Sequence, residues 1–470
     1  MQIPHIRDYQ GKHIHMIGIG GSSMSGLAGM LLEKGYHITG SDQSDGYLLG
    51  ALREKGVVIH IGHDAANVAG ADLVVYTAAI PETNPERAYC REHGVPELER
   101  AWLLGQLMEG SEQSIGISGA HGKTSTTSML SQILVEGGLD PSIHIGGQLD
   151  AIGGSTRIGK SGVFLAEACE FKRSFLKLRP TIAVILNIDA DHLDCYRDID
   201  EIEQTFGEYL DLLPADGLAI GNGDDPRVLR QLRQCGRRAE TFGLEESNDW
   251  YPGNLTRSES GCASFDLMHG GKALCRVTLD VPGDFNLYNA LAALASAHAL
   301  GADMRKAAES LAHFHGAHRR FELTGLLNGC EMFHDYGHNP TEMRNAVSIA
   351  RLRCKGTLYA VMQPHTFSRV KTLFDDYLTC TEKADVTLVT DICAAREVDP
   401  GDINSGMLVE GMRAHGVNAV WTPSFDDTEA WLRAHVRPGD LAITMGCGDI
   451  NRLNDQIARH EAENAEKIGK

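Results

Sequence analysis

A glycine-rich turn near residue 120 constrains the fold more than any other stretch of the chain. Residues 114–118 predict a short strand, the turn has the sequence Gly119-Ala-His-Gly-Lys-Thr124, and a helix follows as far as Gly137. Such a turn presents backbone N–H groups and a helix N-terminus to phosphate oxygens. Position 117 is isoleucine, so the match is to the short Gly-x-x-Gly-Lys-Thr form and not to the full P-loop spacing. The turn predicts a nucleotide triphosphate site in an α/β domain, with a simple helix-capping turn as the alternative.

Length and composition predict a folded chain with more than one core. At 470 residues the sequence suggests about three domains. The net charge of −20 argues against a nucleic-acid partner. Eleven cysteines without a Cys-x-x-Cys pair suit a reducing compartment, and neither a signal peptide nor a membrane-spanning run is recognisable. We therefore expect a cytoplasmic protein without membrane insertion, and the sequence leaves its oligomeric state open.

The first third has the pattern of half a dinucleotide-binding fold. A β-rich run over 13–19 enters a glycine turn and a helix, and the next strand ends at Asp42. Dinucleotide folds place a ribose contact about twenty residues after such a turn. Further strands expected at 57–61 and 73–77 fit an open parallel sheet. The glycines of the turn are Gly18, Gly20 and Gly21. By themselves they are weak evidence, because glycine turns join many strands to helices without any ligand.

In the middle of the chain, two strands lead to side chains that can bind a metal ion. Strand 163–167 ends in a glutamate, and strand 181–187 leads to a loop that contains His192. The carboxyl ends of parallel strands line one crevice, so we expect Thr124, Glu167 and His192 to converge. The oxygens of Thr124 and Glu167 suit Mg²⁺, for which a histidine is a less typical ligand. The alternative is a helix-capping aspartate beside a loop histidine.

Turn-rich β-like pieces between residues 214 and 281 predict a small antiparallel addition to this domain. Asn286 and Asn289 open an alanine-rich helix and share one face, where their amides can contact a nucleobase. Helix capping explains one of them equally well. Arg319 and Arg320 follow, and paired arginines near a phosphate site are natural charge clamps, although such a pair is more often a solvated face.

The last third alternates strands and helices again and predicts a second Rossmann-like layer. The expected strands are 330–334, 358–362, 386–390, 419–422 and 441–445. Asp335, Tyr336 and His338 follow the first of these strands, and Arg369 lies beyond the second. Functional groups at strand exits indicate a ligand site.

Taken in order along nearly the whole chain, these motifs resemble those of the Mur ligase family. The motifs are Gly18-Ile-Gly-Gly-Ser-Ser-Met-Ser-Gly-Leu-Ala, Gly119–Thr124, Glu167-Ala-Cys-Glu, Asp191-His-Leu-Asp194, Asn286-Leu-Tyr-Asn289, Arg319-Arg-Phe-Glu, Asp335-Tyr-Gly-His-Asn-Pro, Gln363-Pro-His-Thr-Phe-Ser-Arg369 and Met445-Gly-Cys-Gly-Asp-Ile. The resemblance implies a three-domain α/β enzyme. Its parts would be a Rossmann-like UDP-sugar-binding domain over 1–110, a central P-loop ATPase-like α/β domain with a small antiparallel addition over 111–324, and a Rossmann-like amino-acid-binding domain over 325–470.

The resemblance also implies ATP and Mg²⁺ and gives each motif a role. The implied catalytic residues are Lys123, Glu167, His192, Arg319 and Arg320, and the implied metal ligands are Thr124, Glu167 and His192. The ATP-binding residues would be Gly119, Ala120, His121, Gly122, Lys123, Thr124, Ser125, Asn286, Asn289 and Asp335. The UDP-sugar would bind at Gly18, Gly20, Gly21, Asp42, Asn84 and Glu86, and the amino acid at Tyr336, His338 and Arg369.

The activity implied by the resemblance is the ATP-dependent joining of L-alanine to the lactyl carboxylate of UDP-N-acetylmuramate in peptidoglycan precursor synthesis. An acyl phosphate would be the intermediate, and ADP and phosphate the other products. Later enzymes of that pathway use a carbamylated lysine downstream of the metal histidine, and no lysine occurs here between Lys177 and Lys272, which favours the alanine-adding branch. The chain departs from the family pattern at Ser23, Cys169, Phe285, His334, Asn339 and Thr366. Some members have a second arginine at position 366, so the predicted carboxylate clamp depends on Arg369.

Three other functions remain open on the sequence. A ligase of the same class could attach a whole peptide to the same UDP-sugar. A nicotinamide-dependent oxidoreductase fits the first glycine turn and Asp42, but it leaves Lys123 and Glu167 without a purpose. A nucleotide-switched regulatory protein would hydrolyse ATP without needing an amino acid. Strictness for alanine over glycine or serine is also open, because a methyl pocket discriminates by only about 1–3 kcal/mol.

Overall fold

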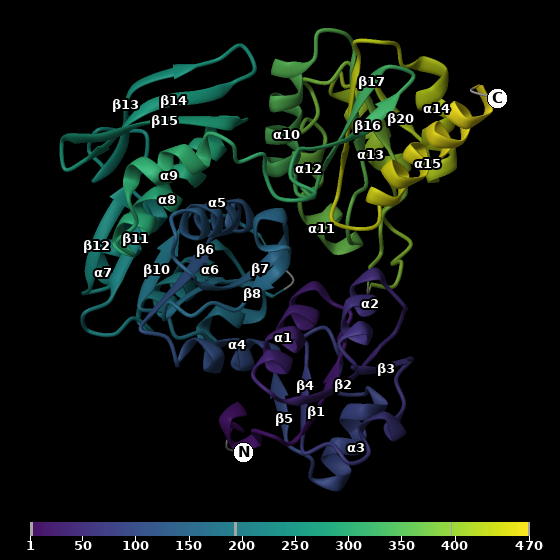
Figure 1. Cartoon of the computed structure of the whole chain (residues 1–470). Helices are drawn as coiled ribbons and strands as arrows, with labels where there is room; N and C mark the ends of the chain where they lie inside the picture. The colour runs from purple at the N-terminus through teal and green to yellow at the C-terminus, as the bar shows by residue number, and fades with distance from the viewer. Residues whose placement is uncertain (1–2, 192–194, 396, 469–470) are drawn as a thin grey trace. The chain divides into compact units, whose positions relative to one another are not determined.

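The computed structural model of the chain describes residues 3–191, 195–395 and 397–468 (Figure 1). The chain divides into two compact bodies. The first body comprises Met1–Leu255, Phe265–Thr278 and Phe285–Phe314, and the second comprises Thr256–Ser264, Leu279–Asp284 and His315–Lys470. The first body contains a five-stranded sheet and most of a ten-stranded sheet, and the second contains a six-stranded sheet. The α/β class predicted from the sequence is confirmed.

The five-stranded sheet is entirely parallel and has the strand order β3-β2-β1-β4-β5. Its strands are β1 (His13–Ile17), β2 (His37–Asp42), β3 (Val58–Ile61), β4 (Leu73–Tyr76) and β5 (Glu97–Glu99). Its helices are η1 (Ile6–Tyr9), α1 (Ser22–Glu33), α2 (Tyr47–Glu54), η2 (Ala65–Val68), α3 (Pro85–His93) and α4 (Arg100–Met108). The chain builds outward from β1 on one side and then crosses to β4 on the other. The strand order therefore reverses between β1 and β4, which is where open α/β sheets bind their ligands.

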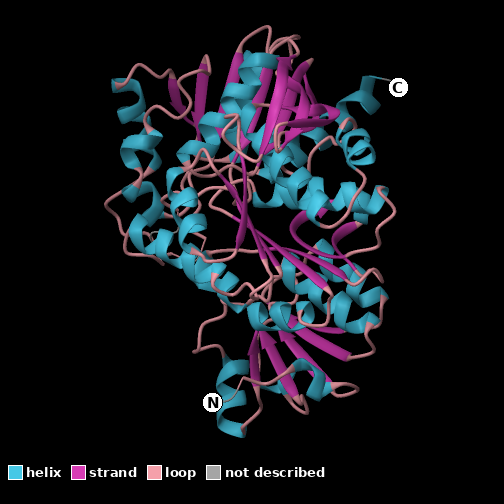
Figure 2. Ribbon diagram, turned by 90° about the vertical axis from the view of Figure 1, so that its left-hand side faces the viewer, coloured by secondary structure: helices cyan, strands magenta, loops and turns pink. Residues whose placement is uncertain are grey.

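The ten-stranded sheet has the order β15-β14-β13-β12-β11-β10-β6-β9-β7-β8. Its strands are β6 (Gln113–Ser118), β7 (Ser142–Leu149), β8 (Gly154–Arg157), β9 (Val163–Glu167), β10 (Ile182–Ile185), β11 (Leu218–Asn222), β12 (Arg238–Phe242), β13 (Trp250–Arg257), β14 (Cys262–His269) and β15 (Lys272–Pro282). Its helices are α5 (Lys123–Glu136), η3 (Asp150–Ile152), η4 (Phe171–Lys177), α6 (Ile199–Leu210), α7 (Pro226–Gln234), α8 (Asp284–Ala299) and α9 (Met304–Leu311). The predicted addition is the meander β13–β15, which continues the parallel sheet through the pair Phe242 and Trp250. Figure 2 distinguishes these strands from the helices around them.

The six-stranded sheet has the order β16-β17-β21-β18-β19-β20 and is parallel except for the pair β16 and β17. Its strands are β16 (Glu322–Leu327), β17 (Cys330–Asp335), β18 (Leu358–Met362), β19 (Val386–Val389), β20 (Ala419–Trp421) and β21 (Leu441–Met445). Its helices are α10 (Pro340–Arg353), α11 (Phe367–Thr372), α12 (Phe374–Tyr377), α13 (Ser405–Ala414), α14 (Phe425–His435) and α15 (Asn451–Ile468). Within the described part of the chain, no helix is both long and apolar enough to span a membrane.

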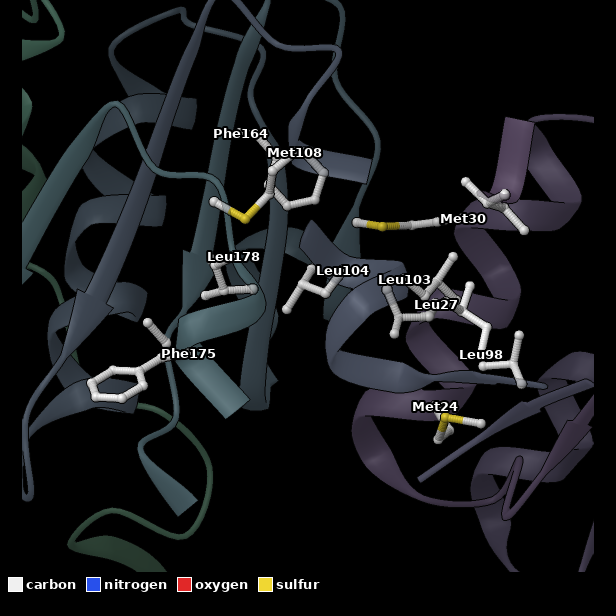
Figure 3. Close-up of a cluster of buried hydrophobic side chains, with 14 of the residues drawn as sticks. Met24, Leu27, Met30, Leu98, Leu103, Leu104, Met108, Phe164, Phe175 and Leu178 are labelled. Atoms are coloured by element: carbon white, nitrogen blue, oxygen red, sulfur yellow. The ribbon is translucent and has the colours of Figure 1, made fainter. Parts of the chain in front are cut away.

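One hydrophobic core joins the five-stranded sheet to the ten-stranded sheet (Figure 3). Helix α4 carries buried side chains into this core, among them Leu103 and Leu104. In Figure 3, Leu103 lies near Leu27 of α1, whereas Leu104 lies toward Leu178, which follows η4. The backbone is equally close there, because a side chain at Gly105 would lie 2.0 Å from the carbonyl oxygen of Lys177. The expected boundary at residue 110 therefore separates two sheets but not two independent cores.

The expected boundary at residue 324 differs from the structure, because it falls inside a strand. Strand β16 pairs with β17 from Glu322 to Leu327, with a register shift between Leu323 and Gly325. The second body already begins its long segment at His315. The six residues of β16 were not predicted as a strand, because Gly325 interrupts their apolar pattern.

Leu104→Ala tests the shared core. We expect the substitution to lower the free energy of unfolding by about 2–5 kcal/mol, because it leaves a cavity between two sheets that pack on one helix. In hydrogen exchange, protection should fall in both β1 and β6. Leu274→Ala is the control, since this side chain is 36% exposed and its loss should cost about 0.5 kcal/mol or less. Loss of protection in one sheet alone would contradict a common core.

Candidate functional site

The predicted phosphate turn connects β6 to α5, and its two glycines are required by space as well as by conformation. Gly119 and Gly122 have φ values of +143° and +85°, which side-chain-bearing residues rarely adopt. A Cβ on Gly122 would lie 2.4 Å from Oδ1 of Asn289, and one on Gly119 would lie 2.9 Å from Leu186. Helix α5 begins at Lys123 without a side-chain cap. Its first N–H groups therefore have no capping side chain and suit an anion.

Lys123 is held directly over this turn. Its ammonium donates to the carbonyls of Gly119 and Ala120 at 2.6 and 3.1 Å, and it lies 2.9 Å from a carboxylate oxygen of Glu170. Burial lowers the pKa of Lys123, but the Glu170 carboxylate outweighs this effect and the net pKa is raised. The lysine is therefore a fixed positive charge at the start of α5, as a phosphate site requires.

Thr124 and Glu167, two of the predicted metal ligands, lie together. The Thr124 hydroxyl donates to Oε2 of Glu167 at 3.0 Å, and the backbone N–H of Gly146 donates to the same oxygen at 2.9 Å. A hydroxyl and a carboxylate are oxygen ligands of the kind that Mg²⁺ takes beside phosphates. The third predicted ligand, His192, lies outside the described residues. Ser125 stands beside Thr124 in the first turn of α5.

The end of strand β10 clamps the turn from the other side. Asn187 accepts from the N–H of His121 at 2.9 Å and donates to the carbonyl of the same residue at 3.0 Å. The His121 ring lies 3.0 Å from Asp189, and this hydrogen bond lowers the pKa of the Asp189 carboxyl. Both contacts hold His121, in the middle of the turn, against the residues that follow β10.

Asn286 and Asn289 lie on α8, and Asn289 packs against the phosphate turn. Thr126 donates to Oδ1 of Asn289 at 3.1 Å, and the Asn289 amide donates to Oδ1 of Asn286 at 3.3 Å. Both asparagines are buried. The structure thus brings this pair to the turn, and their contact with a nucleobase stays a prediction.

The first glycine turn follows β1 and is closed by Asp42, as its position at the end of β2 suggests. The N–H of Gly20 donates to Oδ2 of Asp42 at 2.9 Å. Gly18 has a φ of +79°, and a side chain there would meet Thr77 at 3.0 Å. Gly21 precedes α1, which has no side-chain cap and no acidic residue in its first turn. This end of α1 is therefore suited to an anion.

Asn84 and Glu86, predicted to bind the UDP-sugar, have structural partners. Asn84 caps α3 by accepting from the backbone of Glu86 at 2.9 Å. The Glu86 side chain is fully buried and accepts from Ser41 and Asn67, each at 2.8 Å, with His63 at 2.9 Å. These bonds attach α3 to the end of β2. The contact of Asn84 and Glu86 with the UDP-sugar stays a prediction.

In the second body, Asp335 and Tyr336 lie at the end of β17. The Asp335 carboxylate accepts from the backbone of Phe321 at 2.9 Å and of Gly337 at 2.7 Å, and burial raises its pKa. The guanidinium groups of Arg319 and Arg320 lie 4.9 and 5.0 Å from the centre of the Tyr336 ring. Both arginines thus lie against Tyr336, at distances typical of cation–π contacts.

The two arginines differ in what else they bind. Arg319 donates to the ring of His334 at 3.1 Å and to the carbonyl of Gly448 at 3.3 Å. Burial lowers the pKa of His334 to about 3, so the ring is neutral, and it binds Thr444 at 2.9 Å through its other nitrogen. Within the described residues, neither arginine forms an ion pair, but the Arg320 side chain also has no hydrogen bond of the kind that occupies Arg319. Arg320 is therefore the better candidate for a phosphate.

His338 and Arg369, predicted to bind the amino acid, both lie close to His365. The ring centres of His338 and His365 are 6.1 Å apart, and Arg369 lies 3.2 Å from the His365 ring. Thr366 has a φ of +63° and is the N-cap residue before α11. Glu342 binds the backbone N–H of His338 at 3.0 Å.

Three site residues were not assigned a role from the sequence. Glu170 compensates Lys123, Asn187 fixes His121, and the N–H of Gly146 holds Glu167. Glu170 and Asn187 both follow strand ends, which is the signal that marked Glu167. Gly146 lies within β7, which was not predicted as a strand because its glycines interrupt the apolar pattern.

A glycine-rich turn among the parallel strands of a mixed sheet, with a threonine and a glutamate beside it, is typical of a nucleotide-dependent enzyme of the α/β class. Three protein-family domains match the chain in sequence order. Residues 13–112 match the Mur ligase family catalytic domain, residues 117–297 the Mur ligase middle domain, and residues 319–448 the Mur ligase glutamate ligase domain. The chain belongs to the Mur ligase family.

Proteins that match nearly the full length of this chain share one name. The UDP-N-acetylmuramate–L-alanine ligase of Acetivibrio thermocellus is 42% identical over 95% of this chain and 96% of its own length. The enzyme of the same name from Clostridium novyi is 45% identical over 95% and 97%. The crystal structure of the UDP-N-acetylmuramate-alanine ligase of Thermotoga maritima is 25% identical, with a TM-score of 0.81 over 96% of this chain and 100% of that one. A murein peptide ligase from Psychrobacter arcticus, also 25% identical, has a TM-score of 0.73 over 96% and 98%.

Asn187→Ala tests the clamp on the phosphate turn. We expect ATP to bind about 5- to 150-fold more weakly, because two hydrogen bonds to His121 are lost, at about 1–3 kcal/mol in total. Calorimetric titration with ATP measures the change. Asn222→Ala at the end of the neighbouring strand β11 is the control and should bind ATP normally. Equal affinities for both variants would show that the clamp does not shape the site.

Proposed function

We propose that this chain is a UDP-N-acetylmuramate–L-alanine ligase, which forms an amide between L-alanine and the lactyl carboxylate of the sugar nucleotide and converts ATP to ADP and phosphate. The observation that carries the proposal is the arrangement of Lys123, Thr124 and Glu167 around the uncapped start of α5, in a chain whose full-length relatives carry that name. We also propose that the enzyme acts in the cytoplasm, where both nucleotide substrates are available.

The residues at the turn fit ATP and Mg²⁺. Helix α5 begins without a side-chain cap, so its first N–H groups suit phosphate oxygens, and Lys123 supplies a cation that Glu170 keeps in place. When bound, Mg²⁺ would neutralise phosphate charge, and Thr124 and Glu167 would hold it. Asn289 and Asn286 brace the turn from α8. Arg320 is proposed as the arginine that contacts the γ-phosphate.

The reaction follows from what these side chains can do. Lys123 and Arg320 stabilise negative charge that develops on the transferred phosphoryl group, while the lactyl carboxylate attacks it. The resulting acyl phosphate is then attacked by the amine of alanine, and phosphate leaves. We propose that Tyr336, His338 and Arg369 receive the amino acid, with the Arg369 guanidinium on its carboxylate.

A ligase that attaches a peptide to the same UDP-sugar is the second candidate, because a murein peptide ligase has a similar fold. The two candidates share the nucleotide site and differ in the acceptor of the acyl group. The curated relatives named for L-alanine reach 45% identity over 95% of this chain, against 25% over 96% and 31% over 64% for two murein peptide ligases. This difference favours alanine.

Lys123→Ala and Glu167→Ala test the phosphate and metal assignments. Each should reduce ADP formation by about 100- to 1,000-fold, since charge stabilisation by one positioned group supplies about 2.7–4 kcal/mol. UDP-N-acetylmuramate should still bind with nearly normal affinity. Lys160→Ala, an exposed lysine on the same body, is the control. Turnover unchanged in both site variants would refute the assignments.

Arg369→Ala tests the amino-acid site. The KM for L-alanine should rise about 10- to 100-fold, because the carboxylate loses a charge-assisted pair, while the KM for ATP changes little. Arg369→Lys should recover part of the loss, since it keeps the charge without the planar fork. Initial rates over both substrates measure this. A parallel rise in both KM values would count against a role for Arg369 in amino-acid binding.

A further inference from the structure

Two cations lie at the ligand-binding end of the five-stranded sheet and have no part in the sites described above. Arg100 is the first residue after β5, and Lys172 reaches the same end from the loop after β9. The Lys172 ammonium donates to the carbonyl of Ala78, two residues beyond β4, at 2.9 Å. Lys172 therefore lies beside β4, one of the two strands between which the strand order reverses.

The loop that Lys172 touches is packed on the first glycine turn. A Cβ on Gly18 would lie 3.0 Å from Thr77 and 3.8 Å from Ile80, on either side of Ala78. The ammonium is thus placed next to the turn that precedes α1, where α/β sheets hold the phosphates of a nucleotide.

Arg100 is placed at the first turn of α1 by Ser23. The guanidinium donates to the Ser23 hydroxyl at 3.1 Å, and this hydroxyl lies 2.8 Å from Nε2 of His144. Burial and the nearby Arg100 charge lower the pKa of His144 to about 3, so the ring that holds the Ser23 hydroxyl is neutral. Ser23, one of the departures from the family pattern, therefore orients Arg100.

Neither cation is neutralised within the described part of the chain. Arg100 and Lys172 form no ion pair there. The carboxylates nearest to Arg100 serve other groups, since Glu99 pairs with Lys177 at 2.6 Å and Glu167 accepts from Thr124. Burial lowers the pKa of Arg100, although these carboxylates oppose the effect. The partly buried guanidinium of Arg100 has five N–H donors, and within the described residues it donates to one group, the hydroxyl of Ser23. An anion would accept from the remaining donors and compensate the charge.

The backbone at Lys172 is strained in a way that holds it in place. Lys172 and Arg173 have φ values of +50° and +53° in succession, a left-handed conformation that side-chain-bearing residues avoid. Arg173 holds the turn through ion pairs with Glu201 at 2.7 Å and Glu208 at 3.4 Å. Strain that neighbouring contacts maintain is common at binding sites.

We propose that Arg100 and Lys172 bind the diphosphate of the nucleotide-sugar substrate at the start of α1, with Ser23 as the positioning residue for Arg100. This inference rests on the proposed function, because it assumes that the first body takes a UDP-sugar. It adds two substrate contacts to the glycines and Asp42, one of them supplied across the shared core by the loop after β9.

The test is calorimetric titration of the full chain with UDP-N-acetylmuramate. Arg100→Gln and Lys172→Met should each weaken binding about tenfold or more, and the double variant should weaken it further. The dependence of the affinity on salt concentration should become less steep, because fewer charges meet the diphosphate. Lys172→Arg should restore most of the affinity. The KM for ATP should stay within about twofold, which a general loss of structure would not permit.

Lys55→Met is the matched control, because Lys55 is exposed at the C-terminal end of α2, beside the same sheet, and lies 3.9 Å from Glu33. Urea unfolding of Arg100→Gln checks that the variant is folded, and a folded Lys172→Met keeps the test valid on its own. Normal affinity in both Arg100→Gln and Lys172→Met would overturn the inference. A wild-type chain that binds no UDP-N-acetylmuramate would instead overturn the proposed function.

Discussion

The rest of the structure depends on the ion pair in which Glu170 compensates the buried ammonium of Lys123. Lys123 stands at the start of α5, where a cation is unfavourable for the helix dipole and is shielded from water. Glu170 and two carbonyls of the turn hold it there. Glu170 follows β9, so the charge pair joins the phosphate turn to the strand that also carries Glu167. Lys123, Glu167 and the start of α5 are thereby brought to one end of the ten-stranded sheet.

The shared core determines how the first body can present two substrates. Helix α4 packs on α1 and on the strands of the ten-stranded sheet, so that the first glycine turn and the phosphate turn belong to one folded unit. The contact of Ser22 with Gly146 continues this link to the residue that holds Glu167. A sugar nucleotide bound at α1 would then have a fixed relation to a nucleotide triphosphate bound at α5, which suits a direct attack by a carboxylate on a phosphoryl group.

The sequence predicted the elements whose signals are local. Glycine turns, apolar strands and strand-end residues located β1, β6, β9 and the turn between β6 and α5. Short elements were missed: the three residues of β5 were not predicted as a strand, and β16 lies where a boundary was expected. The sequence also could not predict the partners of the site residues. Glu170 and Asn187 contact the phosphate turn because β9 and β10 lie on either side of β6 in the sheet. The sequence could not separate Arg319 from Arg320, since their difference depends on His334 and the distant Gly448.

The requirement for the amino acid distinguishes the proposed ligase from the two alternative functions. A nucleotide switch would hydrolyse ATP regardless of it, and a peptide ligase would need a longer acceptor. The most direct measurement is phosphate release from ATP with UDP-N-acetylmuramate present, compared across the twenty amino acids and a peptide acceptor. The account predicts release that requires the UDP-sugar and is fastest with L-alanine. Release that is independent of the amino acid, or fastest with the peptide, would contradict it.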